Sequence, residues 1–382
     1  MADQPSIGEL STPPPISGEM PTSVTAFVDF FASGPINTPT PIASFLEFQQ
    51  TFGGLDVRSE SSYQVWQFFS NGGEAAIIVR IAPHPSTANF VSALNSALAD
   101  LTVPFNLLCL PATTNLAPAE MNLTLLAAQA FCTEKNAFYI VDIPPSNVIS
   151  TAPAIESWFA GTRLSNSDFA AVYYPQLSIL DPLNGNAPRE MPASGSVAGI
   201  YATTDSTRGV WKAPAGTSAT ITGATPSVAI DDATSAQLSL NGINAIRTFP
   251  VYGTVVWGAR TTVGANNLDY KYVNVRRLAT YIEQSLKSGL QWVVFEPNNP
   301  TLWASIRLTA STFLNRLWQQ GSFMGTTPQQ AYFVKCDATT MTQNDIDNGR
   351  INIQIGFAPL KPAEFVLISI TMLAAQSKKP SL

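Results

Sequence analysis

The sequence has little charge and almost no histidine. Only 12% of its 382 residues are Asp, Glu, Lys or Arg, about half of the ~25% that is usual for soluble globular domains. There is one histidine, His84, and there are three cysteines, Cys109, Cys132 and Cys336. Because a subunit that meets water on all sides normally carries more charge, the deficit indicates a chain that covers part of its surface with other protein.

The shortage of histidine and cysteine limits the chemistry that the chain can perform. The cysteines are odd in number, widely spaced and without a CxxC pair, so we expect three reduced, buried thiols and no zinc site. A Ser/His/Asp or Cys/His system would have to use His84, which lies between Pro83 and Pro85 in an expected loop. We therefore expect no catalytic residue, no metal ion and no cofactor. A degenerate hydrolase is the least favoured alternative.

Three aspartates and two pairs of glycines are also candidates for a catalytic or phosphate-binding site. Asp142, Asp181 and Asp205 follow expected elements, where α/β enzymes often place carboxylates. No histidine, lysine or metal ligand accompanies them, so we interpret them as turn-capping residues. The Gly-Gly pairs at 53–54 and 72–73 fit no phosphate loop and are interpreted as turns.

Basic clusters and long apolar runs are also missing. The net charge is -6, and no run of Lys and Arg exceeds two residues, which argues against a nucleic-acid partner. The N-terminus has no secretory signal pattern. The longest apolar stretch, Phe365–Ala375, is interrupted by Ser369 and Thr371 and is shorter than the ~20 residues that span a bilayer. We expect no membrane insertion and synthesis in the cytoplasm.

The sequence is rich in short apolar runs that alternate with helical patterns. This alternation predicts βαβ units and a mostly parallel sheet, which is a mixed α/β (α+β) fold. The expected strands are 23–31, 75–81, 105–110, 137–142, 169–174, 243–249, 254–258, 291–295 and 331–335. The expected helices are 45–51, which Ser44 caps, 62–70, 87–101, 118–135, 153–160, 194–203, 273–288 and 300–320.

The two ends of the chain have a different character. Residues 1–20 are rich in Pro, Ser and Gly and are predicted to form an extended arm. Residues 350–357 alternate between isoleucine and polar side chains, and 364–374 form another apolar run. With no helix between them, these two strands are predicted to form an antiparallel pair or an extension that pairs elsewhere.

Two groups of side chains leave two interpretations open. One is a set of aromatic anchors in the core or at a subunit interface: Trp257, Trp292, Trp303 and Trp318. The other is a set of helix-borne arginines that are either solvated or locally paired, or contact an acidic partner: Arg276, Arg277, Arg307 and Arg316.

An ordered series of motifs spans roughly residues 21–370. In the second half they are 242–247 (GINAIR), 256–261 (VWGART), 272–277 (YVNVRR), 281–283 (YIE), 291–298 (QWVVFEPN), 333–337 (FVKCD) and 362–366 (PAEFV). In the first half they are 21–27 (PTSVTAF), 34–37 (GPIN), 52–54 (FGG), 68–73 (FFSNGG) and 199–214, from GIY to KAP. Together they resemble the tail sheath protein of contractile phage tails and phage-tail-like contractile injection systems.

The resemblance implies an architecture and a function. It implies a subtilisin-like α/β core without protease activity, followed by a C-terminal α+β sheath domain, with extended arms at both ends. The domains would be an arm at 1–20, the α/β domain at 21–240, the C-terminal domain at 241–362 and a strand arm at 363–382. The chain would form stacked hexameric rings around an inner tube and contract to drive the tube through a target envelope.

The resemblance also implies partners and a location. The partners would be other copies of the chain, the inner tube protein, and baseplate and cap proteins. The location would be a phage tail or an extracellular phage-tail-like particle that is assembled in the bacterial cytoplasm. The alternative is a minor sheath, cap or baseplate-proximal ring subunit. One departure favours it: relatives begin with a strand like PGVYVEE, whereas here only Ser6–Leu10 is a weak echo.

Members of the family exchange terminal strands between neighbours, which implies particular residues here. The candidates for strand exchange are Ile351, Ile353, Ile355, Phe365, Val366, Leu367, Ile368, Ile370 and Met372. The candidate hinges are Gly18, Pro21, Pro359 and Pro362. A helix of the C-terminal domain lines the lumen in relatives, so the candidates for facing the tube are Arg307, Arg316, Gln319 and Gln320.

Overall fold

The protein is divided into two compact units. The computed structural model describes residues 16, 20–99, 101, 105–162, 164, 167–263 and 269–360, and the backbone of 366–373. One unit is Pro21–Thr280, and the other combines Met1–Met20 with Tyr281–Leu382. This division falls later in the chain than the boundary after residue 240 expected from the sequence.

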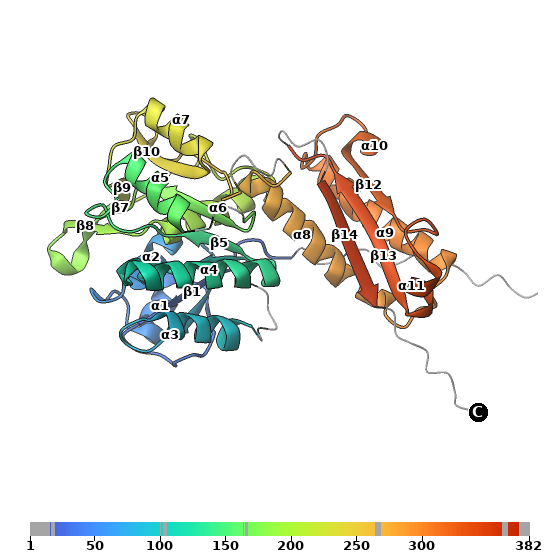
Figure 1. Ribbon diagram of the computed structural model, residues 1–382, viewed down its shortest axis with the longest axis horizontal. Coiled ribbons are helices and arrows are strands. Elements are labelled where there is room, and N and C mark those ends of the chain that lie inside the picture. The colour runs from blue at the N-terminus through green and yellow to red at the C-terminus, as the bar shows by residue number, and fades with distance from the viewer. Residues whose placement is uncertain are drawn as a thin grey trace, which may run out of the picture. The chain divides into compact units, whose positions relative to one another are not determined.

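The larger unit is built on an eight-stranded sheet. Its strands are β1 (Thr25–Asp29), β2 (Thr40–Ile42), β3 (Ala76–Arg80), β4 (Leu107–Cys109), β5 (Phe138–Val141), β6 (Ala170–Tyr174), β10 (Ile243–Phe249) and β11 (Gly253–Val256). Of these, β1, β5 and β10 are labelled in Figure 1. Their order is β11-β10-β6-β5-β4-β1-β3-β2. Only the β2–β3 and β10–β11 pairs are antiparallel. The five inner pairs are parallel, which confirms the βαβ prediction.

Helices cover both faces of this sheet and make three layers. The helices are α1 (Phe45–Phe52), α2 (Glu60–Ser70), α3 (Thr87–Ser92), which continues as the π-helix η1 (Ala93–Leu98), α4 (Pro118–Lys135), α5 (Ala152–Gly161), α6 (Ser194–Arg208) and α7 (Asp232–Leu240). Two short 3₁₀ helices are η2 (Pro111–Asn115) and η3 (Pro182–Asn184). The Ser44 hydroxyl accepts a hydrogen bond from the Glu47 amide, so the predicted cap of α1 is confirmed.

Alternate residues of each central strand face opposite halves of the core. In β1, Ala26 and Val28 pack with α3, α4 and α5, whereas Phe27 packs with α1, α2 and α6. Strands that are buried on both faces need continuous apolar runs. This explains why the sequence shows uninterrupted runs in β3, β4 and β5 rather than alternation.

A second, smaller sheet lies in the same unit and was not predicted. It consists of β7 (Leu177–Asp181), β8 (Ala187–Met191) and β9 (Ala224–Pro226), in the order β8-β7-β9, with both pairs antiparallel. Its strands alternate only weakly, and two of them contain proline, so the sequence pattern gave no strand signal there.

Helix α8 (Val273–Gly289) contains the boundary between the units, and the main part of the second unit begins within it at Tyr281. The further elements are η4 (Gln291–Val293), α9 (Pro300–Gln319), α10 (Pro328–Ala331), β12 (Tyr332–Lys335), α11 (Gln343–Asp347), β13 (Arg350–Phe357) and β14 (Val366–Leu373). The three strands form an antiparallel sheet in the order β12-β13-β14 (Figure 1). The predicted antiparallel pair at the C-terminus is thereby confirmed.

The prediction of a strand at 291–295 is wrong. Gln291–Val293 form a 3₁₀ turn, and the chain then reverses through Val294 and Phe295. The run QWVVF is short and wholly apolar, and a pattern of this kind does not distinguish a strand from a buried turn that joins two helices. All the other strands and helices expected from the sequence are present, with ends that differ by a few residues.

Candidate functional site

Strand β13 lies at the centre of the C-terminal sheet. It pairs with β14 along its whole length, from Arg350 opposite Leu373 to Phe357 opposite Val366. Ile351, Ile353 and Ile355 are fully buried, as their alternation in the sequence predicts. The remaining exchange candidates fall elsewhere. Val366, Leu367, Ile368, Ile370 and Met372 belong to β14, of which only the backbone is described, and Phe365 lies outside the described residues.

Close backbone packing supports the centre of this sheet. A Cβ atom on Gly356 of β13 would lie 2.2 Å from the ring of Phe333 on β12. Glycine at this position therefore allows the Phe333 ring to lie across the strand. On the same strand pair, Tyr332 donates from its hydroxyl to Ser311 O of α9 (3.3 Å).

The segment that follows β13 is fixed at its start. Ala358 N donates to Ala331 O (2.8 Å), Met324 N donates to Ala358 O (2.8 Å), and Pro359 bridges to Phe323. Of the four hinge candidates, Pro359 is therefore held by neighbouring backbone in this structure. Pro362 and Gly18 lie outside the described residues, and Pro21 begins the larger unit.

Among the described residues, the outer edge of β12 is open, whereas the edges of the two sheets of the larger unit are obstructed. The edge strands β2, β8 and β9 contain Pro41, Pro188 and Pro226, and proline blocks the addition of a further strand. The outer side of β11 is occupied by its own chain, since Ile221 N donates to Thr254 O. Strand β12 contains no proline, and within the described residues only β13 pairs with it.

Helix α9 and the residue after it carry the four candidates for facing the tube. Arg307 donates from Nη1 to Cys336 O, and the Arg316 guanidinium lies 5.7 Å from the centre of the Phe313 ring. Both arginines are half-buried, while Gln319 and Gln320 are exposed at the end of the helix. The exposed side of α9 is formed by uncharged residues, namely Pro300, Thr301, Ala304, Leu308, Thr312 and Gln319.

The other two arginines are buried and paired, which decides between the two interpretations left open for them. Arg277 donates to Asp205 from Nη1 (3.0 Å) and Nη2 (2.5 Å), and Nη2 also donates to Thr22 O (2.9 Å). The Thr22 hydroxyl completes the group with a 2.6 Å bond to Asp205. The group therefore ties the first residues of the larger unit to α6 and α8. Arg276 pairs in a similar way with Asp168 (3.1 Å).

The four tryptophans divide between core and surface. Trp303 is buried and donates from its indole nitrogen to Asn298 (2.7 Å), as a core anchor would. Trp292 and Trp318 are half-buried. Trp257 is exposed, and its ring lies tilted against that of Phe249, with the ring centres 4.6 Å apart.

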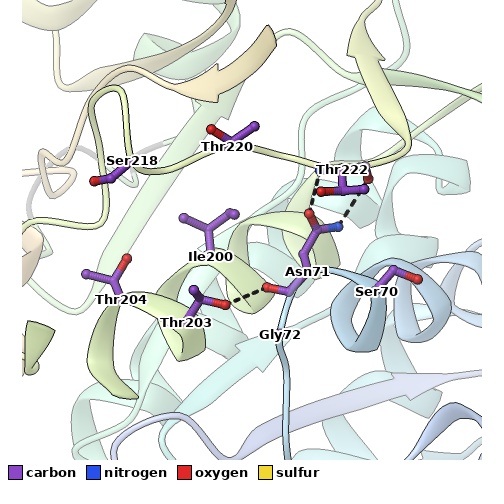
Figure 2. Close-up of a pocket in the computed structure, with 9 residues that line it drawn as sticks. All are labelled: Ser70, Asn71, Gly72, Ile200, Thr203, Thr204, Ser218, Thr220 and Thr222. Carbon is purple, nitrogen blue, oxygen red and sulfur yellow. Dashed lines mark hydrogen bonds between the residues drawn. The ribbon is translucent and has the colours of Figure 1, made fainter. Parts of the chain in front are cut away.

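One pocket of the larger unit is lined by hydroxyls (Figure 2). It measures about 290 Å³ and lies between the end of α2, helix α6 and the loop before β9. Asn71 joins these elements, because its side chain accepts from Thr222 N (2.7 Å) and its carbonyl accepts from Thr203 Oγ1 (2.8 Å). A Cβ atom on Gly72 would lie 1.9 Å from that Thr203 hydroxyl, so the predicted Gly-Gly turn requires glycine here. None of the described residues that line this pocket is charged.

A second pocket contains the single histidine. It measures about 430 Å³ and lies at the carboxyl ends of β1, β3 and β4, where the strand order reverses and α/β proteins often bind ligands. Asp29 and His84 both line it. Asp29 accepts from the amides of Phe30 (2.6 Å) and Ser61 (3.0 Å), and burial raises the pKa of Asp29 to about 7.

The described lining of the pocket around His84 does not support the hydrolase alternative. No serine or cysteine is among the described residues that line it. All three cysteines are free and buried, and burial raises the pKa of each thiol, that of Cys336 to about 12. Thiols of this kind are poor nucleophiles because little thiolate forms. Within the described part of the chain, no three potential metal ligands gather.

The three aspartates singled out in the sequence have structural partners. Asp142 accepts from the amides of Ala193 (3.1 Å) and Ser194 (2.9 Å) at the start of α6. Asp181 caps η3 through the amide of Leu183 and also accepts from the Tyr63 hydroxyl (2.9 Å). Asp205 lies within α6, where it pairs with Arg277. The first two therefore have the capping geometry that was predicted.

Comparison with known proteins identifies the family to which this chain belongs. Residues 85–262 match the phage tail sheath protein central domain, and residues 265–372 match the phage tail sheath C-terminal domain. The chain belongs to the phage tail sheath protein family. The resemblance inferred from the sequence motifs is thereby confirmed, as is the mixed α/β fold. Within the described residues, no helix has both the length and the apolar character needed to cross a bilayer.

Solved structures match the chain over almost its full length. A chain of the anti-feeding prophage helical sheath in the contracted state is 30% identical, with a TM-score of 0.74, and the match covers 96% of this chain and 99% of that one. A chain of the anti-feeding prophage baseplate, 6-fold symmetrised, is 29% identical, with a TM-score of 0.74, and the match covers 97% and 99%.

Curated relatives are longer. The tail sheath protein of Vibrio phage KVP40 is 26% identical over 184 residues, which are 47% of this chain and 26% of that protein. The chain spans between about a quarter and about half of the length of the curated relatives it matches.

Proposed function

We propose that the chain is the structural subunit of a contractile sheath, in a phage tail or a phage-tail-like injection particle. It polymerises as stacked hexameric rings around an inner tube, and contraction of this lattice drives the tube through a target envelope. The observation that carries the proposal is the C-terminal sheet, in which a terminal strand pairs fully with β13 while no further described strand pairs with β12. The matches to a contracted helical sheath and to a 6-fold baseplate support it.

Neighbouring subunits can be joined by exchanging β14 between their C-terminal sheets. In the structure, eight residues of β14 face eight of β13 in one register. A neighbour's β14 can make the same main-chain hydrogen bonds, each contributing about 0.5–1.5 kcal/mol net. An element exchanged between identical subunits forms no new kind of contact, so the exchange costs little. Residues 358–365 are the connection that must open, with Pro359 released from Phe323 and Pro362 as the second hinge.

The residues proposed for the exchange are the ones that the family resemblance implied. The acceptor positions are Ile351, Ile353 and Ile355 of β13, and the donated positions are Phe365, Val366, Leu367, Ile368, Ile370 and Met372. The open edge of β12 would take the second extended segment. The N-terminal arm of another neighbour, with Gly18 and Pro21 as its hinge, is the segment available for this role.

Electron microscopy of the purified chain tests this function. The intact chain should form long hollow cylinders under negative stain, and removal of residues 363–382 should abolish them. In a matched control, the sequence of residues 374–382, which follow β14, is scrambled, and the cylinders should remain intact. An intact chain that stays monomeric would contradict the proposal.

A single-ring subunit is the second candidate. The weak N-terminal strand motif at Ser6–Leu10 and the match to a baseplate chain favour a minor sheath, cap or baseplate-proximal ring. The same micrographs separate the two roles. Isolated rings from the intact chain indicate the ring subunit, and cylinders indicate the major sheath.

A further inference from the structure

Phe295 occupies a turn position that normally requires glycine. Glu296 N donates to Val293 O (3.1 Å) and closes a four-residue turn. Val294 has φ −65° and ψ 127°, and Phe295 has φ 81°. These are the dihedral angles of a type II turn, whose third residue is usually Gly or Asn. A bulky side chain at positive φ is an outlier, because its Cβ crowds the backbone.

The same residue is also the most exposed aromatic side chain described. Phe295 is 83% exposed, and the neighbouring Glu296 and Pro297 are exposed as well. An isolated subunit gains nothing from this arrangement, because the turn is strained and the ring remains in water. Strain of this kind is typically retained where a binding or switching function requires it.

We propose that Phe295 is an aromatic anchor that inserts into a second copy of this chain when subunits assemble. The proposal rests on the proposed function, because it supposes that the chain polymerises. Aromatic side chains that fill a pocket on the partner often supply most of the binding energy of an interface. The turn presents the ring on a short, hydrogen-bonded loop, so little conformational entropy is lost when it is buried.

The position of the turn points to a second copy as the occupant. Asn298, two residues after the turn, donates from Nδ2 to Arg350 O (3.2 Å), and its Oδ1 accepts from Trp303 (2.7 Å). Arg350 is the first residue of β13 and lies opposite Leu373, the last residue of β14. The turn is thus attached to one end of the sheet for which strand exchange is proposed, and it is the end at which a β14 strand donated by a second copy would finish.

Assembly of the full-length chain tests the anchor. Phe295→Gly should raise the thermal midpoint of the unassembled subunit, because glycine adopts this turn without strain. It should also raise the protein concentration needed for polymerisation by at least tenfold. Val251→Ala is the matched control, since Val251 is equally exposed at 83% on a hairpin of the other unit, and it should change neither value.

Two results would overturn the inference. If the Phe295→Gly variant polymerises at the same protein concentration as the wild type, Phe295 is not an anchor. A lower thermal midpoint would show that the ring supports the fold of its own subunit. If the wild-type chain does not polymerise, the proposed function itself is contradicted. If the wild type and Phe295→Gly polymerise equally well, only the anchor role of Phe295 is contradicted.

Photo-crosslinking identifies the occupant directly. The full chain with p-benzoylphenylalanine in place of Phe295 is assembled with the inner-tube protein and irradiated. Crosslinks to a peptide of a second copy are expected, and isotope-mixed subunits distinguish them from crosslinks within one chain. A crosslink to the tube protein, or to the N- or C-terminal arm of the same chain, would contradict the proposal.

Discussion

Single residues in the core of the larger unit couple its stability to pH. Asp142 is fully buried, and burial raises the pKa of its carboxyl group to about 7 in spite of two amide hydrogen bonds to Oδ1. Its Oδ2 is buried without a hydrogen-bond partner among the described residues. The ordinary aspartate pKa of 3.8 applies to the unfolded chain, so between about pH 4 and pH 7 the folded state binds more protons.

Because the folded state binds more protons than the unfolded state, its stability should depend on pH. Stability should fall as the pH rises from about 4 to about 7, by at most about 4 kcal/mol for Asp142. Asp142→Asn keeps an oxygen acceptor for the amides of Ala193 and Ser194 and removes the buried charge. It should raise the free energy of unfolding at pH 8 and leave it nearly unchanged at pH 4.

Urea unfolding at the two pH values measures this effect. Asp29, whose pKa burial also raises to about 7, contributes a slope of the same sign that remains in the variant. Asp142→Ala is the control, because it loses the acceptor and should be less stable than Asp142→Asn at both pH values. Equal pH slopes for the wild type and Asp142→Asn would refute the argument.

At the scale of elements, the exposed edge of β12 is the feature that assembly can use. The hydrogen bond from Ala358 N to Ala331 O sets the alternation of this strand pair. Val334 is three residues from Ala331, so its backbone N–H and C=O turn away from β13. A proline there removes an outward donor without breaking a bond to β13.

Val334→Pro should therefore impair assembly more than folding. The concentration needed for polymerisation should rise at least tenfold, while the thermal midpoint of the unassembled chain should fall by only a few degrees, consistent with about 1 kcal/mol. Light scattering and thermal unfolding measure the two quantities. Val334→Thr keeps the N–H and should polymerise as the wild type does. Normal polymerisation of Val334→Pro would show that nothing adds to this edge.

At the scale of the whole molecule, the low charge has a physical use. A subunit that contacts several copies of itself would have to desolvate any charge placed at those contacts. On α9, both arginines turn to partners in their own unit, and the exposed side is neutral. We therefore propose that α9 faces the inner tube chiefly through uncharged side chains, with Arg307, Arg316, Gln319 and Gln320 at the margins of that surface.

A charge placed in the middle of this surface tests the proposal. Leu308→Glu, at a residue that is 53% exposed, should leave folding and sheath polymerisation intact but reduce binding to the inner tube at least tenfold. Co-sedimentation with assembled tubes measures it. Leu240→Glu, at an exposed leucine of the larger unit, is the control and should bind normally. Unchanged tube binding by Leu308→Glu would place the tube elsewhere.

Much of this protein follows from the sequence alone. Helix caps such as Ser44, the continuous apolar runs of β3 and β4, and the isoleucine alternation of β13 depend on neighbours in the chain, so local pattern is sufficient to predict them. The ordered motifs were sufficient for the family. The small β7–β8–β9 sheet was missed because its strands are stabilised by pairing rather than by their own pattern.

Only the tertiary structure decided which side chains meet and which remain exposed. The Arg277–Asp205 pair joins residues far apart in the chain, and no spacing rule predicts such a contact. The run that contains Phe295 looked like a strand, because its apolar character is the same whether the chain extends or turns. Whether that ring lies in the core or in water depends on the helices on either side of the turn, α8 and α9, and on Asn298 at β13. Burial and long-range pairing are properties of the folded chain, and the local sequence does not carry them.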